Sequence, residues 1–300
     1  MSNSLLSAMT EAGVMPASVL PLPIHGEIQR FQVASDKNGS LNGWITSFSN
    51  QTNEEVFVFG SWKNGVKHIY SDNRTSGYDY STREKINSLM KSAKIAKEEL
   101  QKQTATNCFN LWEEAIPATS HPYLESKNIK PHIARTYNDN WLLIPVVDAD
   151  RHLTSLQTIS PSGKKTFKKD GRIAGCYCPI GYEGQAKIIL ICEGFATGAT
   201  LREATNLPVI VAFNAGNLRP VAETIRLENP TSIVVICADN DHLNKGNNVG
   251  LIKGEQAAKQ ASGLFVFPSF SANDEGSDFN DFAQIHGKGI IQSIIMEATS

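Results

Sequence analysis

The stretch KIILICEGFATGATLREATNLPVIVAF, residues 187–213, decides the fold of the second half of the chain. Two apolar runs, at residues 187–192 and 208–213, flank a segment at residues 196–206 that has the composition of a helix. Apolar strands without polar alternation, separated by helices, are typical of a parallel sheet that is covered on both faces. The stretch therefore predicts a strand, a helix and a second strand of one such sheet.

The same alternation continues towards the C-terminus. SIVVIC at residues 232–237 and LFVF at residues 264–267 have strand character, and helical segments stand before, between and after them. We therefore predict an α/β fold for residues 186–300, with a mostly parallel sheet and helices on both faces.

The first 185 residues have a different organisation. Residues 1–75 contain short alternating runs separated by turn residues, which predicts a small β-rich region. Residues 76–120 carry a long helical pattern followed by a linker, and residues 121–185 combine two strand-like runs with a lysine-rich loop. We expect the last of these segments to be a basic subdomain of mixed α+β structure.

Composition excludes several classes of protein. The net charge of −2 and the 41% hydrophobic content are ordinary for a globular chain. The sequence contains no apolar stretch of about 18 residues, so we predict no membrane span. The N-terminus lacks the basic segment of a secretion signal, so we expect a cytoplasmic protein. The five cysteines are odd in number and lack zinc-site spacing, so we expect neither a disulfide framework nor zinc.

Acidic side chains follow three of the predicted parallel strands. Glu193 comes directly after the first strand, Asp239 and Asp241 follow the strand at residues 232–237, and Asp278 and Asp281 follow the last strand after a loop. Ligands of open α/β sheets bind beyond the carboxyl ends of the strands. Taken singly, each acid is explained by a turn or a helix cap, but their joint position at one edge favours a functional site.

Carboxylates gathered in this way are suited to a divalent metal. Mg²⁺ takes oxygen ligands, and two aspartates at i and i+2 of an extended segment point to the same side. We therefore predict a metal site at this edge of the sheet. Its expected ligands are Glu193, Asp239, Asp241, Asp278 and Asp281.

The order of these motifs resembles the Toprim domain, which bacterial primases, topoisomerases and some nucleases share. The sequence CEGFATGATLREATNLPVIVAFNAGNL, followed by ADND and DFND, is most similar to the Toprim primases of phages and plasmids. HPYLESKNI and the segment LLIPVVDADRHLTSLQTISPSGKKTFKKDGRIAG resemble the region that precedes Toprim in bacterial primase catalytic cores.

This resemblance implies a DNA primase, a DNA-directed RNA polymerase that makes short RNA primers by metal-dependent nucleotidyl transfer. The expected setting is replication of a plasmid, a phage or another mobile element. Mg²⁺ or Mn²⁺ would be the cofactor, with Asp239 and Asp241 catalytic and Glu193 acting as general base or as metal ligand. The expected partners are single-stranded DNA, NTPs, and a replicative helicase or an initiator protein, and no membrane.

The resemblance also implies that the basic loop contacts template or nucleotide. Its basic residues are dense for a chain of net charge −2, which predicts a local positive face. Lys245, in the loop after Asp239 and Asp241, is expected to close over a nucleotide phosphate. The loop residues are Lys164, Lys165, Lys168, Lys169 and Arg172.

Two other functions fit the same residues. A Toprim nuclease would use the acidic set to cleave a phosphodiester bond without NTPs. A replication module that binds single strands without catalysis would be expected to have a broken acidic set, whereas the set in this chain is complete.

Overall fold

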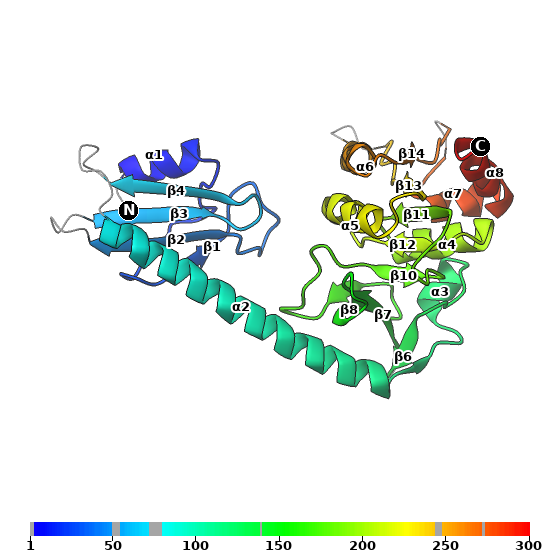
Figure 1. The fold of residues 1–300 in the computed structure, drawn as a ribbon, viewed down its shortest axis with the longest axis horizontal. Helices are drawn as coiled ribbons and strands as arrows, with labels where there is room; N and C mark the ends of the chain where they lie inside the picture. Colours follow the sequence, from blue (N-terminus) through cyan, green and yellow to red (C-terminus); the bar gives the residue numbers. More distant parts are fainter. Residues whose placement is uncertain (1–2, 50–54, 72–79, 139, 244–247, 272–273) are drawn as a thin grey trace. The chain divides into compact units, whose positions relative to one another are not determined.

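A computed structural model describes residues 3–49, 55–71, 80–138, 140–243, 248–271 and 274–300 (Figure 1). The chain divides into two compact units, Met1–Glu98 and Glu99–Ser300. Helix α2 (Tyr80–Glu114) contains the boundary between them. Each unit is described below by itself.

The N-terminal unit is built on a four-stranded antiparallel sheet in the order β1-β2-β3-β4. Helix α1 packs on one face, where its Leu5 and Met9 join Ile45 and Phe59 in a buried cluster. The β-rich N-terminal region expected from the sequence is confirmed. The elements are α1 (Asn3–Glu11), β1 (Gln29–Phe31), β2 (Gly43–Ser49), β3 (Glu55–Ser61) and β4 (Val66–Ser71).

The second unit begins with a five-stranded antiparallel sheet in the order β5-β6-β7-β8-β9. Its central hairpin joins β7 and β8, and the pairing register shifts between Val146 and Val147. The short strand β9 carries part of the basic loop. The elements are β5 (Ile116–Pro117), α3 (Pro122–Ser126), β6 (Arg135–Tyr137), β7 (Trp141–Val147), β8 (Leu153–Ile159) and β9 (Lys165–Phe167).

The second sheet of this unit has the order β10-β12-β11-β13-β14. Strands β11 to β14 pair in parallel, and the edge strand β10 pairs with β12 in antiparallel orientation. The predicted mostly parallel sheet is confirmed. Its strands are β10 (Cys178–Ile180), β11 (Ile188–Cys192), β12 (Val209–Val211), β13 (Ile233–Cys237) and β14 (Leu264–Val266).

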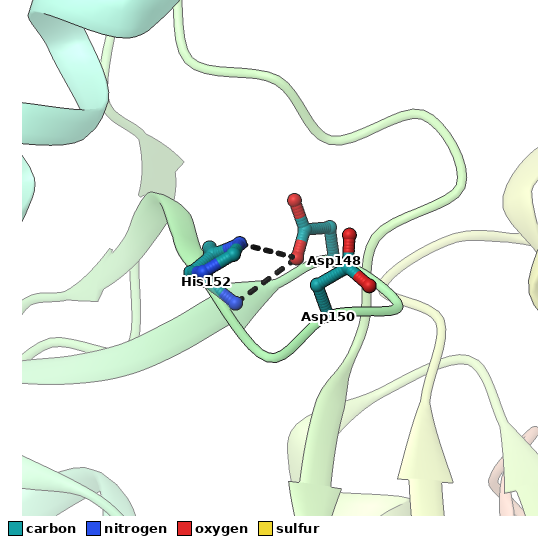
Figure 2. A group of neighbouring side chains, drawn as sticks. All are labelled: Asp148, Asp150 and His152. Atoms are coloured by element: carbon teal, nitrogen blue, oxygen red, sulfur yellow. Dashed lines mark hydrogen bonds and ion pairs between the residues drawn. The ribbon is translucent and has the colours of Figure 1, made fainter.

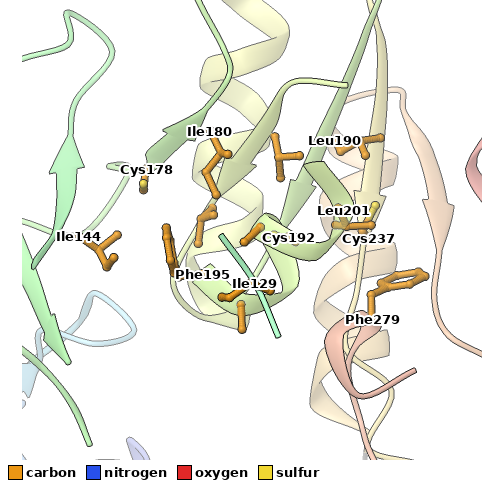
Figure 3. Packing of buried hydrophobic residues seen from close by; sticks show 14 of the residues in the cluster. Ile129, Ile144, Cys178, Ile180, Leu190, Cys192, Phe195, Leu201, Cys237 and Phe279 are labelled. Carbon is orange, nitrogen blue, oxygen red and sulfur yellow. The ribbon is translucent and has the colours of Figure 1, made fainter. Parts of the chain in front are cut away.

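Helices cover both faces of this sheet, which is why its strands are apolar on both sides. On one face, Phe195, Leu201 and Phe279 pack around Cys192 and Cys237 (Figure 3). On the other face, α5 and α6 form a second buried cluster with the sheet. The helices are α4 (Phe195–Thr205), α5 (Ala215–Glu228), α6 (Val249–Gln260), α7 (Phe279–His286) and α8 (Lys288–Ala298).

Helix α4 lies unusually close to the sheet because of one glycine. A Cβ at Gly198 would lie 2.6 Å from Cγ2 of Val211 and 3.2 Å from Sγ of Cys192. The close approach sets the start of α4 at the edge of the sheet where the acidic residues stand. Among the described residues, no helix has both the length and the apolar character needed to cross a membrane.

Candidate metal centre

Strand pairing places the first two acidic residues side by side. Cys192 of β11 and Cys237 of β13 are direct partners in the parallel register. Each strand ends at that cysteine, so Glu193 and Asp239 leave the same edge of the sheet on adjacent strands. Two carboxylates are thereby brought together by backbone hydrogen bonding alone.

Asn240 separates the two aspartates and faces the protein interior. Its backbone N–H donates to Ser277 O at 2.6 Å, and its Nδ2 donates to Pro268 O at 2.8 Å. Because side chains alternate along an extended segment, Asp239 and Asp241 are left on the opposite side. The bond to Ser277 also draws the segment that carries Asp278 against this loop.

Asp278 and Asp281 stand at the start of α7. Asp278 is the N-cap: its Oδ1 accepts from the N–H of Asp281 at 2.9 Å, and its Oδ2 accepts from Thr197 Oγ1 of α4 at 3.1 Å. Asp281 has both carboxylate oxygens engaged, with Lys127 Nζ at 3.2 Å and with the N–H of Ser277 at 3.1 Å. Asp278 therefore joins the carboxylate group of the sheet edge, whereas Asp281 holds α7 against the end of α3.

Burial and mutual repulsion make the carboxylates hard to ionise in the metal-free protein. The pKa of Asp239 is raised to about 8, chiefly by burial and then by the charges of Glu193 and Asp278. The pKa of Glu193 is raised to about 7, again by burial first and then by the charge of Asp241, while the backbone N–H groups of Asp239 and Ala215 partly offset this rise. An opposite charge at this edge would reverse both shifts.

Two of the carboxylate oxygens are buried and have no hydrogen-bond partner: Oε1 of Glu193 and Oδ1 of Asp239. A buried carboxylate oxygen without a donor is costly, because it has lost its water and gained nothing in return. Hard divalent cations bind oxygen ligands of this kind. The residues present therefore fit the divalent metal expected at the sheet edge.

A second acidic group lies in the turn between β7 and β8. Asp148, Asp150 and His152 each offer one possible ligand atom, and these atoms lie within 4.8 Å of one another (Figure 2). Among the described residues, no three carboxylates of the sheet edge have ligand atoms that close together. The sequence analysis did not single out this group, although the acids and the histidine alternate in DADRH.

The contacts of Asp148 explain this turn without a metal. Its Oδ1 accepts from the N–H of His152 at 3.0 Å, which closes the turn, and its Oδ2 accepts from Arg172 at 2.6 Å. Asp150 and His152 are exposed. Asp148 is thus already neutralised by a cation, in contrast to Asp239.

Of the five loop residues predicted to bind nucleic acid or nucleotide, Lys165 reaches the carboxylates. Its Nζ lies 5.3 Å from the ring centroid of Tyr123 and interacts electrostatically with Asp278 and Asp239. Desolvation lowers the pKa of Lys165, and the charge of Asp278 partly raises it again. The side chain therefore brings a positive charge near Asp278 and Asp239.

The other predicted cations are elsewhere. Arg172 pairs with Asp148, Lys164 is exposed, and the backbone carbonyl of Lys169 accepts from Thr104 of α2. Lys168 is half-buried. Lys245 lies outside the described residues.

Sequence analysis missed Lys127, whose ammonium contacts Asp281. Burial lowers the pKa of Lys127, whereas the charges of Asp281 and Asp278 raise it. The net result is a pKa above the ordinary value of lysine. Lys127 lies within the quoted segment HPYLESKNI, but its contact with a residue 154 positions away has no local signal.

The C-terminal fold and its site define the class of this part of the chain. Residues 188–289 match the family described as the Toprim domain. These residues therefore form a Toprim domain, and the carboxylates described above stand at the edge of its sheet.

Two curated relatives, both named DNA primase TraC and both from Escherichia coli, resemble the chain over most of its length. One is 29% identical over 87% of the chain and the other 27% identical over 82%. The chain spans about a quarter of the length of the first relative and less of the second, since the matches cover 25% and 18% of them. A solved DnaG primase catalytic domain bound to ssDNA has a TM-score of 0.48 and 11% identity, covering 66% of this chain and 80% of its own.

The raised pKa values predict how pH changes the stability of the metal-free protein. The folded state keeps protons on Glu193 and Asp239 that the unfolded chain releases near its ordinary pKa values. Their stabilising contribution is complete below about pH 4 and is lost as the pH rises through about 7 to 8. We expect the melting temperature in EDTA to fall between about pH 6 and pH 8.5, and Mg²⁺ to restore more of it at the higher pH.

Thermal unfolding with and without Mg²⁺ checks this expectation. Asp239→Asn should reduce both the alkaline loss of stability and the response to Mg²⁺, because it removes the group with the larger shift. Asp150→Asn is the matched control in the other acidic turn. A Mg²⁺ response that survives Asp239→Asn and disappears with Asp150→Asn would move the metal site to the turn between β7 and β8.

Proposed function

We propose that the protein is a DNA primase that synthesises short RNA primers on single-stranded DNA. The observation that carries the proposal is the pair of buried, unpartnered carboxylate oxygens at the edge of a Toprim sheet. The similarity to DNA primase TraC over 87% of the chain supports the same activity. Primer synthesis for a plasmid, a phage or another mobile element, in the cytoplasm, is the setting that we propose.

In this proposal, Asp239 and Glu193 hold the divalent cation, and Asp241 and Asp278 complete its surroundings. Bound Mg²⁺ or Mn²⁺ would lower the pKa of the primer 3′-hydroxyl and neutralise charge on the α-phosphate and the leaving pyrophosphate. Glu193 would act as a metal ligand or as the general base, and both roles use its buried carboxylate at the sheet edge. Asp281 contributes through its ion pair with Lys127, which fixes the start of α7.

The start of α4 provides a place for phosphate in the same region. Its N-cap is Gly194, which has no side chain to occupy the first backbone N–H groups of the helix. Such N–H groups bind anions together with the positive end of the helix dipole. Lys165 adds a cation to this side of the site, so we assign the triphosphate of the incoming NTP to the start of α4 and to Lys165.

We assign the remaining basic residues to the template. Lys164, Lys168, Lys169 and Arg172 supply charge that does not depend on template sequence, and Lys245 keeps its expected role at a nucleotide phosphate. A replicative helicase or an initiator protein is the further partner that replication of a mobile element would require.

Asp239→Asn should abolish primer synthesis and leave the protein folded. The substitution removes the anionic oxygen that would hold the metal, so we expect at least about a hundredfold loss. The measurement is incorporation of labelled ribonucleotides on random single-stranded templates with Mg²⁺ or Mn²⁺. Asp150→Asn serves as the control and should keep full activity.

The same assay separates a primase from a nuclease. A primase extends a product when NTPs are present, whereas a Toprim nuclease shortens labelled DNA with Mg²⁺ alone. Cleavage without NTPs that is lost in Asp239→Asn would replace the primase proposal with the nuclease. Full incorporation by Asp239→Asn would reject this site altogether.

Lys165 and Lys164 are adjacent lysines in different environments, and they make a matched pair. Lys165→Ala should raise the KM for NTPs and lower the incorporation rate by about tenfold or more, because its ammonium faces the acidic site. Lys164→Ala should change the incorporation rate less than threefold or so, because both lysines are exposed but Lys165 is the one that interacts with Asp278 and Asp239, and a solvated lysine makes a weak, screened contact. Equal losses in the two variants would show that the loop acts through its total charge.

A further inference from the structure

The sheet of the N-terminal unit carries a line of residues that crosses all four strands. The register pairs Arg30 of β1 with Trp44 of β2, and Trp44 with Gly60 of β3. Gly60 in turn pairs with Lys67 of β4. Directly opposed residues of an antiparallel sheet point to the same face. One face therefore has a cation at each edge and a tryptophan between them, over three strand spacings of about 4.8 Å each.

Gly60 makes room for a pair of tryptophans on this face. A Cβ at Gly60 would lie 2.0 Å from Val66 O and 3.0 Å from Cζ2 of Trp44, so the glycine allows the Trp44 ring to lie over β3. Trp62 packs against that ring, with centroids 5.4 Å apart and an angle of 34° between the planes. The N–H of Trp62 donates to Asn42 O at 2.9 Å, which fixes the residue at the end of β3.

The two rings differ in exposure. Trp44 is 2% exposed and belongs to the packed core of the sheet, whereas Trp62 is 40% exposed. Trp44 therefore supports the Trp62 ring by direct packing, while part of Trp62 stays exposed to solvent. An indole held in this way loses little freedom when a second flat group stacks on it.

The cations at the two edges are available for a ligand. Arg30 and Lys67 are exposed, and in the part of the chain that the structure describes neither of them is in an ion pair. Lys63, next to Trp62, is different because its Nζ is held by Asp36 at 2.6 Å. Arg30 donates through Nε to Leu41 O at 2.9 Å, a bond that does not use its two terminal nitrogens.

We infer that this face of the N-terminal unit binds single-stranded nucleic acid. A base stacks on Trp62, and the phosphates on either side of it lie against Arg30 and Lys67. Aromatic rings flanked by cations bind single strands with little sequence preference, because every base has a flat face and every nucleotide a phosphate. A duplex fits poorly, since its bases are already stacked on one another.

The site goes beyond the proposed catalysis, because it lies in the other unit of the chain and requires neither metal nor NTP. The test is a fluorescence titration of the full chain, in EDTA, with oligo(dT) of about ten nucleotides. Stacking on Trp62 should quench its emission. Trp62→Phe should lose the quench while still binding, and Trp141→Phe should keep it, since Trp141 is an equally exposed tryptophan at 39% in the second unit.

Affinities measured by anisotropy of labelled oligonucleotide give a second readout. Trp62→Ala should weaken binding by about tenfold or more, with Trp141→Ala unchanged. The slope of log affinity against log salt is negative, and Arg30→Ala and Lys67→Ala should each make it less steep by about 0.7. Lys187→Ala should leave the slope unchanged. Oligo(rU) replaces oligo(dT) in a second arm to separate RNA from DNA, and a hairpin duplex should compete weakly.

Three results would overturn the inference. The first is oligonucleotide quenching of tryptophan emission that persists in Trp62→Phe, and the second is an oligonucleotide affinity that Trp62→Ala leaves unchanged. The third is self-association of the chain that Trp62→Ala abolishes while oligonucleotide binding stays the same. Circular dichroism tests whether Trp62→Ala is folded. If it is not folded, the fluorescence titration of Trp62→Phe tests the inference instead. Asp239→Asn should keep the quench, so failure of catalysis and failure of this site are distinguished.

Discussion

The parallel pairing of β11 with β13 is the constraint on which the site depends. Because Cys192 and Cys237 are register partners, the two strands end together and release Glu193 and Asp239 at one point. The apolar strands and the helices on both faces hold that register against the repulsion of the acids. Energy from hydrophobic burial thus maintains a group of carboxylates that would otherwise move apart, and a cation is the natural complement to it.

A set of buried polar contacts carries this arrangement outward to the neighbouring elements. Asn280 of α7 donates to Lys127 O at 2.7 Å and to Thr200 Oγ1 at 2.8 Å, which ties α3, α4 and α7 together. Asn217 of α5 accepts from Gly175 N–H and donates to Cys176 O, both at 2.8 Å, and so fixes the end of the basic loop. Buried amides with every contact satisfied specify one packing. They hold the antiparallel sheet and its lysines in place beside the Toprim sheet.

The sequence predicted the features that depend on local pattern. Continuous apolar strands between helices indicated a parallel sheet, and chain order placed Glu193, Asp239 and Asp278 at its carboxyl edge. Contacts between distant segments had no such pattern. The ion pair of Lys127 with Asp281, the contact of Arg172 with Asp148 and the antiparallel pairing of β10 with β12 all join segments that are distant in the sequence. The line from Arg30 to Lys67 likewise depends on strand register, which composition does not reveal.

We propose that the sheet edge is a metal site assembled from carboxylates that the metal-free protein keeps partly protonated. Calorimetric titration with Mn²⁺ at about pH 7, in two buffers of different ionisation enthalpy, counts the protons released on binding. With pKa values of about 7 for Glu193 and about 8 for Asp239, binding should release protons, and Asp239→Asn should reduce the number released per bound ion because only Glu193 remains to release one. Binding without proton release, or with the same release in that variant, would contradict the account.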